Sequence, residues 1–290
     1  MSVSQLSHAE PEMAFDGWAT PQLRMRSLGK GPVALLVHGT ASTSHSWLAL
    51  AERLKHHFTL LIPDLPGHGA SAVPEPGRYS PLAMATALHH ALEAIDEQPE
   101  LVVGHSAGCA VLARGLAAGT LSARGFIALN PALLPLPGLQ QFVLPGLARV
   151  LAGAPMIAEV VALQGRDRVA VKGLLQGIGS KLDGESVDAY RRLFADPAHV
   201  RSVLRMMAEW NLPDVAACLP SVQLPTYLIG GGRDRAVPAH QLERLVRRFP
   251  DAERVLLTQV GHLAQEEQPD TVARLVLDWC ERRLSFDTAC

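Results

Sequence analysis

The chain has 290 residues, 26 basic against 28 acidic side chains and a net charge of −2. No basic block accompanies this balance, so the composition gives no electrostatic basis for binding nucleic acid. The four cysteines show no paired spacing, which argues against a disulfide framework and favours a reducing compartment. Residues 1–11 lack the basic and apolar regions of an export signal, so we expect a cytoplasmic protein.

Apolar runs typical of strands alternate with helical patterns from residue 33 to 130 and again from 225 to 284. This alternation predicts an α/β domain with one mostly parallel sheet and helices on both faces. The two parts of the core are residues 1–130 and 223–290. Residues 131–222 are expected to form a helical cap inserted between two strands of that sheet.

The first strand of this pattern is predicted over residues 33–37 and leads into His38-Gly39-Thr40. A second apolar run ends at Asp64, but the glycines that follow indicate a tight loop, so we interpret this carboxylate as structural. His38, His68 and His105 lie in turns where packing or backbone hydrogen bonding explains them as well as function does.

The most specific motif is Gly104-His105-Ser106-Ala107-Gly108, between the apolar run 101–103 and the small-residue helical stretch 109–118. A G-x-S-x-G sequence on a strand-to-helix turn predicts a nucleophile elbow, whose strained backbone exposes the serine Oγ. Ser106 is therefore the candidate nucleophile. A serine hydroxyl is a poor nucleophile at neutral pH, so it needs a base that is oriented by a carboxylate.

The strand pattern stops between residues 130 and 224, and a connection of that length must contain its own helices. Apolar spacing predicts helices over 185–194 and 197–210. The apolar stretch 142–163 contains prolines and charges that argue against a membrane span. We expect it to lie against a lipophilic ligand or a membrane surface.

Met206, Met207 and Trp210 lie in the helix predicted over 197–210. Thioether side chains adapt to irregular apolar shapes, so these three residues are candidate substrate contacts, with ordinary core packing as the alternative. The composition of the cap, rich in leucine, valine, methionine and alanine, favours a large apolar substrate.

Two further strand ends supply the groups that Ser106 needs. The predicted strand 226–229 runs into a glycine turn that ends at Asp234, the candidate acid. The predicted strand 254–257 is followed by His262, the candidate base. The order Ser, Asp, His, with each residue just past a strand, is that of the α/β-hydrolase arrangement.

An oxyanion hole completes such a site, because the tetrahedral intermediate of acyl transfer carries negative charge. The backbone amides of Thr40 and Ala107 are the candidate donors. The sequence shows no cluster of metal-ligating residues, so we expect neither a metal nor a cofactor.

Five segments together resemble the α/β-hydrolase-type magnesium chelatase accessory proteins of bacteriochlorophyll biosynthesis: HGTASTSHSW (38–47), VGHSAG (103–108), LNPALLPLPG (129–138), MMAEW (206–210) and GHLAQEE (261–267). The resemblance covers residues 15–280. The elbow and the strand-end Asp and His are shared by all α/β-hydrolases, so they do not distinguish one branch of the family from another. The leucine-proline run 133–138 and the methionine-tryptophan segment 206–210 are the parts that resemble the accessory proteins specifically.

The resemblance implies a role in or beside magnesium insertion into protoporphyrin IX in a photosynthetic bacterium. It implies protoporphyrin IX or magnesium protoporphyrin as the ligand, magnesium chelatase subunits as partners, and a cytoplasmic location with peripheral contact at the inner membrane. Three interpretations stay open, because metal insertion transfers no acyl group and a complete site can be retained for binding alone. They are a serine hydrolase of the tetrapyrrole pathway, a non-catalytic porphyrin-binding accessory module, and a generic esterase or carbon-carbon hydrolase for lipophilic substrates.

Overall fold

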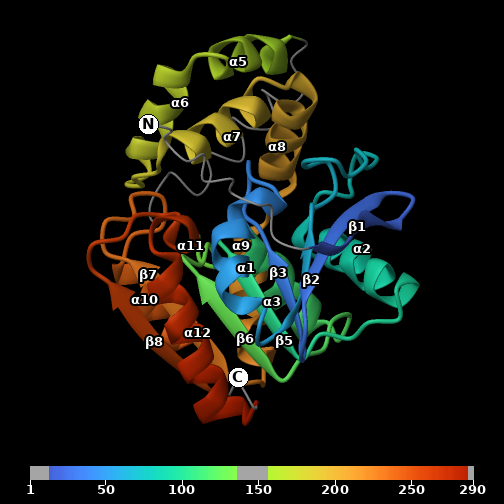
Figure 1. The fold of residues 1–290 in the computed structure, drawn as a ribbon, viewed down its shortest axis with the longest axis vertical. Helices are drawn as coiled ribbons and strands as arrows, with labels where there is room; N and C mark the ends of the chain where they lie inside the picture. Colours follow the sequence, from blue (N-terminus) through green and yellow to red (C-terminus); the bar gives the residue numbers. More distant parts are fainter. Residues whose placement is uncertain (1–12, 136–155, 287–290) are drawn as a thin grey trace, which may run out of the picture.

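An eight-stranded sheet forms the centre of the computed structural model, which describes residues 13–135 and 156–286 (Figure 1). The strand order is β1-β2-β4-β3-β5-β6-β7-β8, and the six strands from β4 to β8 are parallel to one another. In sheet order they are β4 (Thr59–Pro63), β3 (Val33–Val37), β5 (Leu101–His105), β6 (Gly125–Leu129), β7 (Thr226–Gly231) and β8 (Ala252–Leu257).

A hairpin that the apolar pattern did not reveal precedes these strands. It consists of β1 (Met13–Thr20) and β2 (Leu23–Gly29), and β2 pairs antiparallel with β4. Arginines alternate with the buried Leu23 and Met25 in β2, as in a strand with one face on the core. Five of the strands from residue 33 onward have nearly continuous buried runs instead, and β8 has the apolar sequence Val255-Leu256-Leu257, so these were the strands that the apolar pattern predicted.

Helices cover both faces of the sheet, as predicted (Figure 1). The core on one face contains residues of α2 (Pro81–Ala94), α3 (Ala107–Ala117) and α10 (His240–Val246). The other face packs against α1 (Leu48–Leu54) and α12 (Pro269–Leu284). Successive residues of a strand point to opposite faces of the sheet, so Val102 packs in the first of these two core clusters and Val103 in the second.

Four helices lie beyond the carboxyl ends of the parallel strands and form the cap (Figure 1). They are α5 (Ile157–Gly165), α6 (Arg168–Gly177), α7 (Gly184–Phe194) and α8 (Pro197–Glu209). The predicted helices 185–194 and 197–210 agree with α7 and α8 to within one residue. Asp183 and Asp196 cap the N-termini of these two helices and so fix the residues at which they begin. Most of the predicted stretch 142–163 lies outside the described residues, and its last part is α5.

Short elements connect the cap and the core. The chain returns from the cap through α9 (Leu212–Cys218) and the 3-10 turn η2 (Leu219–Ser221), and Val215 and Leu219 pack in the core cluster that contains α3. A second 3-10 turn, η1 (Ser44–Trp47), precedes α1, and α11 (Ala264–Glu267) precedes α12. Within residues 13–135 and 156–286, no helix has the length and hydropathy of a membrane span.

Candidate active site

Ser106 occupies the turn between β5 and α3 with φ 50° and ψ −116°. A positive φ is uncommon for a residue with a Cβ, and such strain persists only where the surroundings impose it. The N–H of Ser106 donates to the carbonyl oxygen of Leu129 at 2.9 Å. Behind the turn, a Cβ on Gly108 would collide with the carbonyl oxygen of Val37, so this glycine permits the close approach of α3 to β3. The turn therefore has the geometry of the predicted nucleophile elbow.

The structure brings Ser106, His262 and Asp234 together in a line of hydrogen bonds. Asp234 lies in the turn after β7, and His262 lies in the loop between β8 and α11. The Oγ of Ser106 is 3.0 Å from Nε2 of His262, and Nδ1 of His262 is 2.8 Å from Oδ2 of Asp234. His262 and Asp234 are buried, whereas Ser106 is half-buried, so the hydroxyl is the member of this line that a ligand can reach.

Both oxygens of the Asp234 carboxylate are held by further donors. The backbone amides of Ala236 and Val237 each donate to Oδ1 at 2.8 Å. The side-chain amide of Asn130 donates to Oδ2 at 2.7 Å. These bonds fix the plane of the carboxylate, so His262 is presented with Nδ1 toward the acid and Nε2 toward the hydroxyl.

Asn130 is a part of the site that the sequence interpretation missed. It follows β6 with a φ of 46°, and its backbone N–H donates to the carbonyl oxygen of Ile229 at 2.7 Å. The same Nδ2 that bonds Asp234 also contacts the carbonyl oxygen of Gly261 at 3.0 Å. One side chain therefore joins the turn that carries the acid to the loop that carries the base. The strand-end position that identified Asp234 also applies to Asn130, directly after a buried strand.

The loop after β3 lies against the elbow. A Cβ on Gly39 would be 3.0 Å from Cβ of Ser106, so the residue before Thr40 lies against the nucleophile. Ala107 is the first residue of α3, so its amide has no acceptor within the helix. Across the part of the chain that the structure describes, no hydrogen bond occupies the amide of Thr40 or of Ala107. The two amides predicted as donors of an oxyanion hole therefore have no acceptor among the described residues and stay candidates for that role.

Buried histidines organise the backbone around these groups. Nε2 of His105 donates to the carbonyl oxygen of His262 at 2.8 Å, and burial lowers the pKa of His105 to about 3. Nδ1 of His38 donates to the carbonyl oxygen of Gly39 at 2.8 Å, while its Nε2 accepts from the amide of Leu65 at 2.9 Å. Burial lowers the pKa of His38 to about 3 as well. Both imidazoles are neutral linkers of loops, in keeping with the packing interpretation.

Asp64 has a comparable role in the loop after β4. Its Oδ1 accepts from the amide of Ser44 at 2.7 Å and its Oδ2 from the amide of Ala70 at 3.0 Å. It thereby ties the start of η1 to the loop 64–72, as expected for a structural carboxylate.

The three predicted cap contacts occupy different environments. Met206 is fully buried, and its Sδ accepts a hydrogen bond from Oγ1 of Thr40 at 3.6 Å, so it reaches the loop beside Ser106. Met207 is 41% exposed. Trp210, the C-terminal cap of α8, is half-buried and packs against the core cluster that includes α3.

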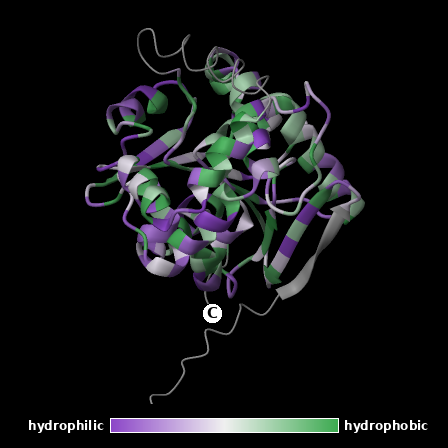
Figure 2. Cartoon of the chain, turned by 90° about the horizontal axis from the view of Figure 1, so that it is seen from above, coloured by the Kyte–Doolittle hydropathy of each residue, from purple (hydrophilic) through white to green (hydrophobic). Residues whose placement is uncertain are grey.

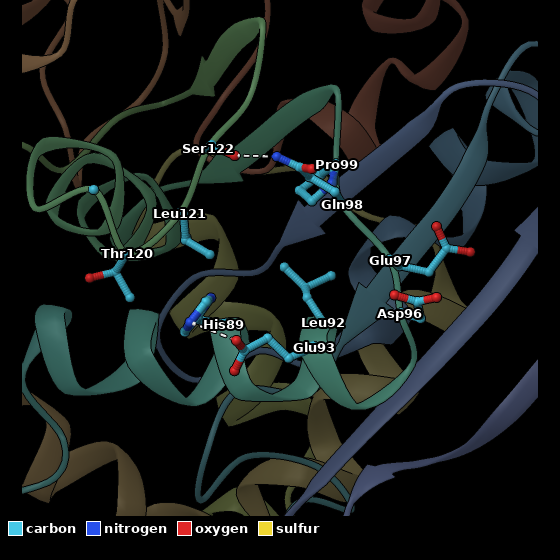
Figure 3. Close-up of a pocket in the computed structure, with 11 residues that line it drawn as sticks. His89, Leu92, Glu93, Asp96, Glu97, Gln98, Pro99, Thr120, Leu121 and Ser122 are labelled. Atoms are coloured by element: carbon cyan, nitrogen blue, oxygen red, sulfur yellow. Dashed lines mark hydrogen bonds and ion pairs between the residues drawn. The ribbon is translucent and has the colours of Figure 1, made fainter.

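Other hollows of the described surface lie at varying distances from this line of residues. One of about 450 Å³ lies between the end of α2 and the loop after α3 (Figure 3). It contains the ion pair of His89 with Glu93 at 3.4 Å and a hydrogen bond from Gln98 to Ser122 at 2.7 Å. Gln98 precedes β5, so this hollow lies at the amino edge of the sheet, opposite the triad.

A different hollow, of about 670 Å³, adjoins the turn that carries Asp234. Its lining includes Lys181, Arg233 and Arg235, all of them exposed. A cationic surface therefore lies next to the buried acid. Within residues 13–135 and 156–286, no group of three or more His, Cys, Asp or Glu side chains is arranged to hold a metal ion.

Comparison with known proteins agrees with this geometry. The α/β-hydrolase family model matches residues 34–275. The chain belongs to the α/β-hydrolase family. It is 37% identical over 253 residues to the magnesium-chelatase 30 kDa subunit of Rhodobacter capsulatus, which covers 87% of each chain. This similarity confirms the resemblance that the five sequence segments indicated.

Esterases are also among the similar proteins. The chain is 28% identical to a pimeloyl-[acyl-carrier protein] methyl ester esterase of Vibrio vulnificus, over 91% of this chain and 97% of the relative. The structure of a thermophilic esterase from Thermogutta terrifontis superposes with a TM-score of 0.75 at 25% identity, covering 90% of this chain and 93% of the other. The predicted fold class is thus confirmed.

Proposed function

We propose that the protein acts beside magnesium chelatase in bacteriochlorophyll biosynthesis and that it does so as a serine hydrolase. The continuous line of hydrogen bonds from Ser106 through His262 to Asp234 supports the hydrolase part of this proposal. The 37% identity to a chelatase subunit supports the pathway.

The reaction that fits this geometry is hydrolysis of an ester or thioester. Nε2 of His262 takes the proton from Ser106 as Oγ attacks the carbonyl carbon, and the amides of Thr40 and Ala107 bind the resulting oxyanion. Asp234 holds the imidazole in the tautomer that leaves Nε2 free to accept. The imidazolium then gives its proton to the leaving alcohol or thiol, and water releases the acyl group by the same steps.

The proposed ligand is a tetrapyrrole such as protoporphyrin IX or its magnesium form. Met206 beside Thr40 and the half-buried Trp210 supply apolar contacts of the kind that a flat macrocycle needs. The cations Lys181, Arg233 and Arg235 next to Asp234 suit the carboxylate groups of such a ligand. Magnesium is a substrate of the chelatase in this proposal, so the chain needs no magnesium site of its own.

We further propose that chelatase subunits are partners and that the protein works in the cytoplasm, in peripheral contact with the inner membrane. Tetrapyrroles of this kind are apolar and partition into lipid, so delivery at a membrane surface avoids a passage through water.

A non-catalytic accessory module is the second candidate function. It is favoured by the relative's description as a chelatase subunit, because magnesium insertion contains no acyl transfer. The esterase relatives favour a third, a generic lipophilic-ester hydrolase.

Complementation of a strain that lacks the gene separates the three. We expect the wild-type protein to restore bacteriochlorophyll, Ser106→Ala to restore it only partly, and Met206→Ala combined with Trp210→Ala to fail because both proposed apolar contacts with the ligand are lost. Full restoration by Ser106→Ala at matched expression would favour the binding module. Normal pigment in the deletion strain would exclude both pathway functions and leave the generic lipophilic-ester hydrolase as the remaining candidate.

A further inference from the structure

Exposed apolar side chains are concentrated on the two outer helices of the cap. Nine large apolar side chains are exposed among the described residues, and six of these lie at or in α5 and α6. Val169 is 78% exposed, Met156 is 70% exposed and Leu163 is 64% exposed. We call the six residues the outer apolar surface: Met156, Val160, Val161, Leu163, Val169 and Leu174. Contiguous surfaces of this kind mark interaction sites in soluble proteins.

The helix α5 has its larger apolar side chains on the outside. Three buried small residues, Ala158, Ala162 and Gly165, recur at the spacing i, i+4, i+7 and face the cap. Met156, Val160 and Leu163 recur at the same spacing and are exposed. An ordinary surface helix has the reverse arrangement, with its bulky apolar side chains inward. The exposed stripe is therefore not explained by packing of α5 onto the protein.

Packing of the inner stripe is already complete. Ala158 and Ala162 form a cluster with Val200 of α8. A Cβ on Gly165 would collide with the carbonyl oxygen of Phe194 at the end of α7. Helix α5 is thus seated closely on α7 and α8 through small residues, and its outer stripe is left for something outside the cap.

The position of these helices makes the surface accessible. Helix α5 lies on the side of the cap that faces away from the sheet, whereas α6 runs from there toward the core, where Val171 and Leu175 pack with Leu263 (Figure 1). Seen from above, hydrophobic and hydrophilic residues are interspersed along the helices on this side of the molecule (Figure 2). The sequence that leads into α5, residues 136–155, contains a single charged residue, Arg149.

Several charged side chains lie on or next to the helices that carry the outer apolar surface, and some of them form ion pairs. Glu159 pairs with Arg201, and Asp188 pairs with Arg168 at 3.0 Å. The carboxylate of Asp167 accepts from the amide of Val169 at 2.8 Å and caps α6.

Two further cations of α5 and α6 complete this pattern. Arg166 and Lys172 are exposed, and neither has an acidic partner in the described parts of the chain. Among the described residues, the charges of α5 and α6 that lack an opposite partner are therefore the two cations Arg166 and Lys172, against the one capping carboxylate of Asp167.

We propose that the outer apolar surface inserts into the headgroup region of a lipid bilayer that contains anionic lipids, with Arg166 and Lys172 at its rim. Aliphatic side chains flanked by cations are typical of helices that lie in a membrane interface.

This surface deepens the peripheral membrane contact proposed above and does not depend on whether Ser106 reacts. Because the cap lies over the carboxyl ends of the strands (Figure 1), binding through its outer side would hold the site close to the bilayer.

Co-sedimentation with vesicles tests the proposal on the full chain. We expect the wild-type protein to bind vesicles of equal parts phosphatidylcholine and phosphatidylglycerol, and to bind pure phosphatidylcholine vesicles less. Val160→Glu combined with Leu163→Glu should lower the bound fraction on the order of tenfold. Arg166→Glu combined with Lys172→Glu should lower only the binding to anionic vesicles. Val73→Glu, at a residue that is 54% exposed outside this surface, is the matched control and should bind as the wild type does.

Three results would overturn the proposal. They are a wild-type protein that binds neither vesicle, a Val160→Glu and Leu163→Glu variant that binds like the wild type, or a wild-type dimer in light scattering that the same variant converts to a monomer. The last result would assign the surface to a second copy of the chain. Circular dichroism of each variant and labelling of Ser106 by a fluorophosphonate show that the core and the triad are intact, so failure here is distinct from failure of the proposed chemistry.

Discussion

Asn130 and His262 contact the same oxygen of the Asp234 carboxylate. Nδ2 of Asn130 is 2.7 Å from Oδ2, and Nδ1 of His262 is 2.8 Å from it. Since Asn130 also contacts the carbonyl oxygen of Gly261, it connects the acid to the residue that precedes the base. We infer that Asn130 is a positioning residue, which acts on Ser106 only through Asp234 and His262.

Replacement of Asn130 tests this role. Asn130→Ala should slow the reaction of Ser106 with a fluorophosphonate by up to about a hundredfold, because a small displacement of a catalytic group has an effect of that size. Asn130→Asp should slow it further, since a second carboxylate would lie against Asp234. An Asn130→Ala protein that reacts at the wild-type rate, with an unchanged thermal melt, would show that the backbone amides of Ala236 and Val237 suffice.

The buried histidines should make the fold sensitive to acid. Burial lowers the pKa of His38 and of His105 to about 3, from the ordinary value of 6.5. Below pH 6.5 the unfolded chain takes up protons that the folded chain does not, so each histidine reduces stability as the pH falls. We expect the loss of unfolding free energy between pH 6.5 and 5.5 to be smaller in His38→Gln than in the wild type, by about 1 kcal/mol.

Urea unfolding at the two pH values measures this difference. His105→Gln should show the same reduction, whereas Val73→Gln, at an exposed position without a titratable group, should keep the wild-type dependence. Equal pH dependence in all four proteins would mean that these buried imidazoles take up protons in the folded state.

Glu266 should have the opposite effect on stability. Burial raises its pKa to about 8, and the hydroxyl of Tyr190 donates to its Oε1 at 2.7 Å across the boundary between cap and core. Glu267 and Asp183, whose negative charges also raise this pKa, are the nearby acids. The unfolded chain loses this proton near pH 4.5, so the folded state is penalised progressively as the pH rises from about 4.5 to about 8.

Thermal melts of Glu266→Gln should reveal that penalty. The variant removes the charge and keeps an oxygen that can accept from Tyr190. Its melting temperature, relative to that of the wild type, should therefore rise between pH 5 and pH 8. A difference that stays constant over this range would contradict the assignment of a protonated carboxyl group.

Porphyrin binding is the subject of a further prediction. Protoporphyrin IX or its magnesium form should quench tryptophan fluorescence saturably, and Trp210→Phe should remove much of the quench, because Trp210 borders the proposed ligand contacts. Trp47 and Trp279 are fully buried in the opposite core cluster and should contribute less. Quenching that never saturates would indicate nonspecific adsorption of the porphyrin.

The sequence predicted the parts of the site that depend on local pattern. Ser106, Asp234 and His262 each follow a continuous apolar run, and the parallel sheet places the ends of all three runs at one edge. Asn130 also follows such a run, but its function appears only in the contacts with Asp234 and Gly261. These are tertiary contacts across 104 and 131 residues of chain.

The cap shows the limit of periodicity more clearly. Met206 and Met207 are neighbours in the sequence and chemically identical, so composition gives them the same role. The structure buries Met206 against Thr40 and leaves Met207 exposed. The stretch 142–163 was expected to face a lipophilic ligand or a membrane surface, but only the structure shows which stripe of α5 the cap covers and which is exposed.

Labelling of the purified protein with a fluorophosphonate tests the central claim, that Ser106, His262 and Asp234 form a working nucleophile. The account predicts that the wild-type protein is modified at Ser106, as identified by mass spectrometry of the peptide, and that Ser106→Ala is not modified. Loss of the nucleophile in such sites lowers turnover on the order of a millionfold, so residual labelling should be undetectable. A wild-type protein that stays unlabelled under conditions that label a known serine hydrolase would contradict the account.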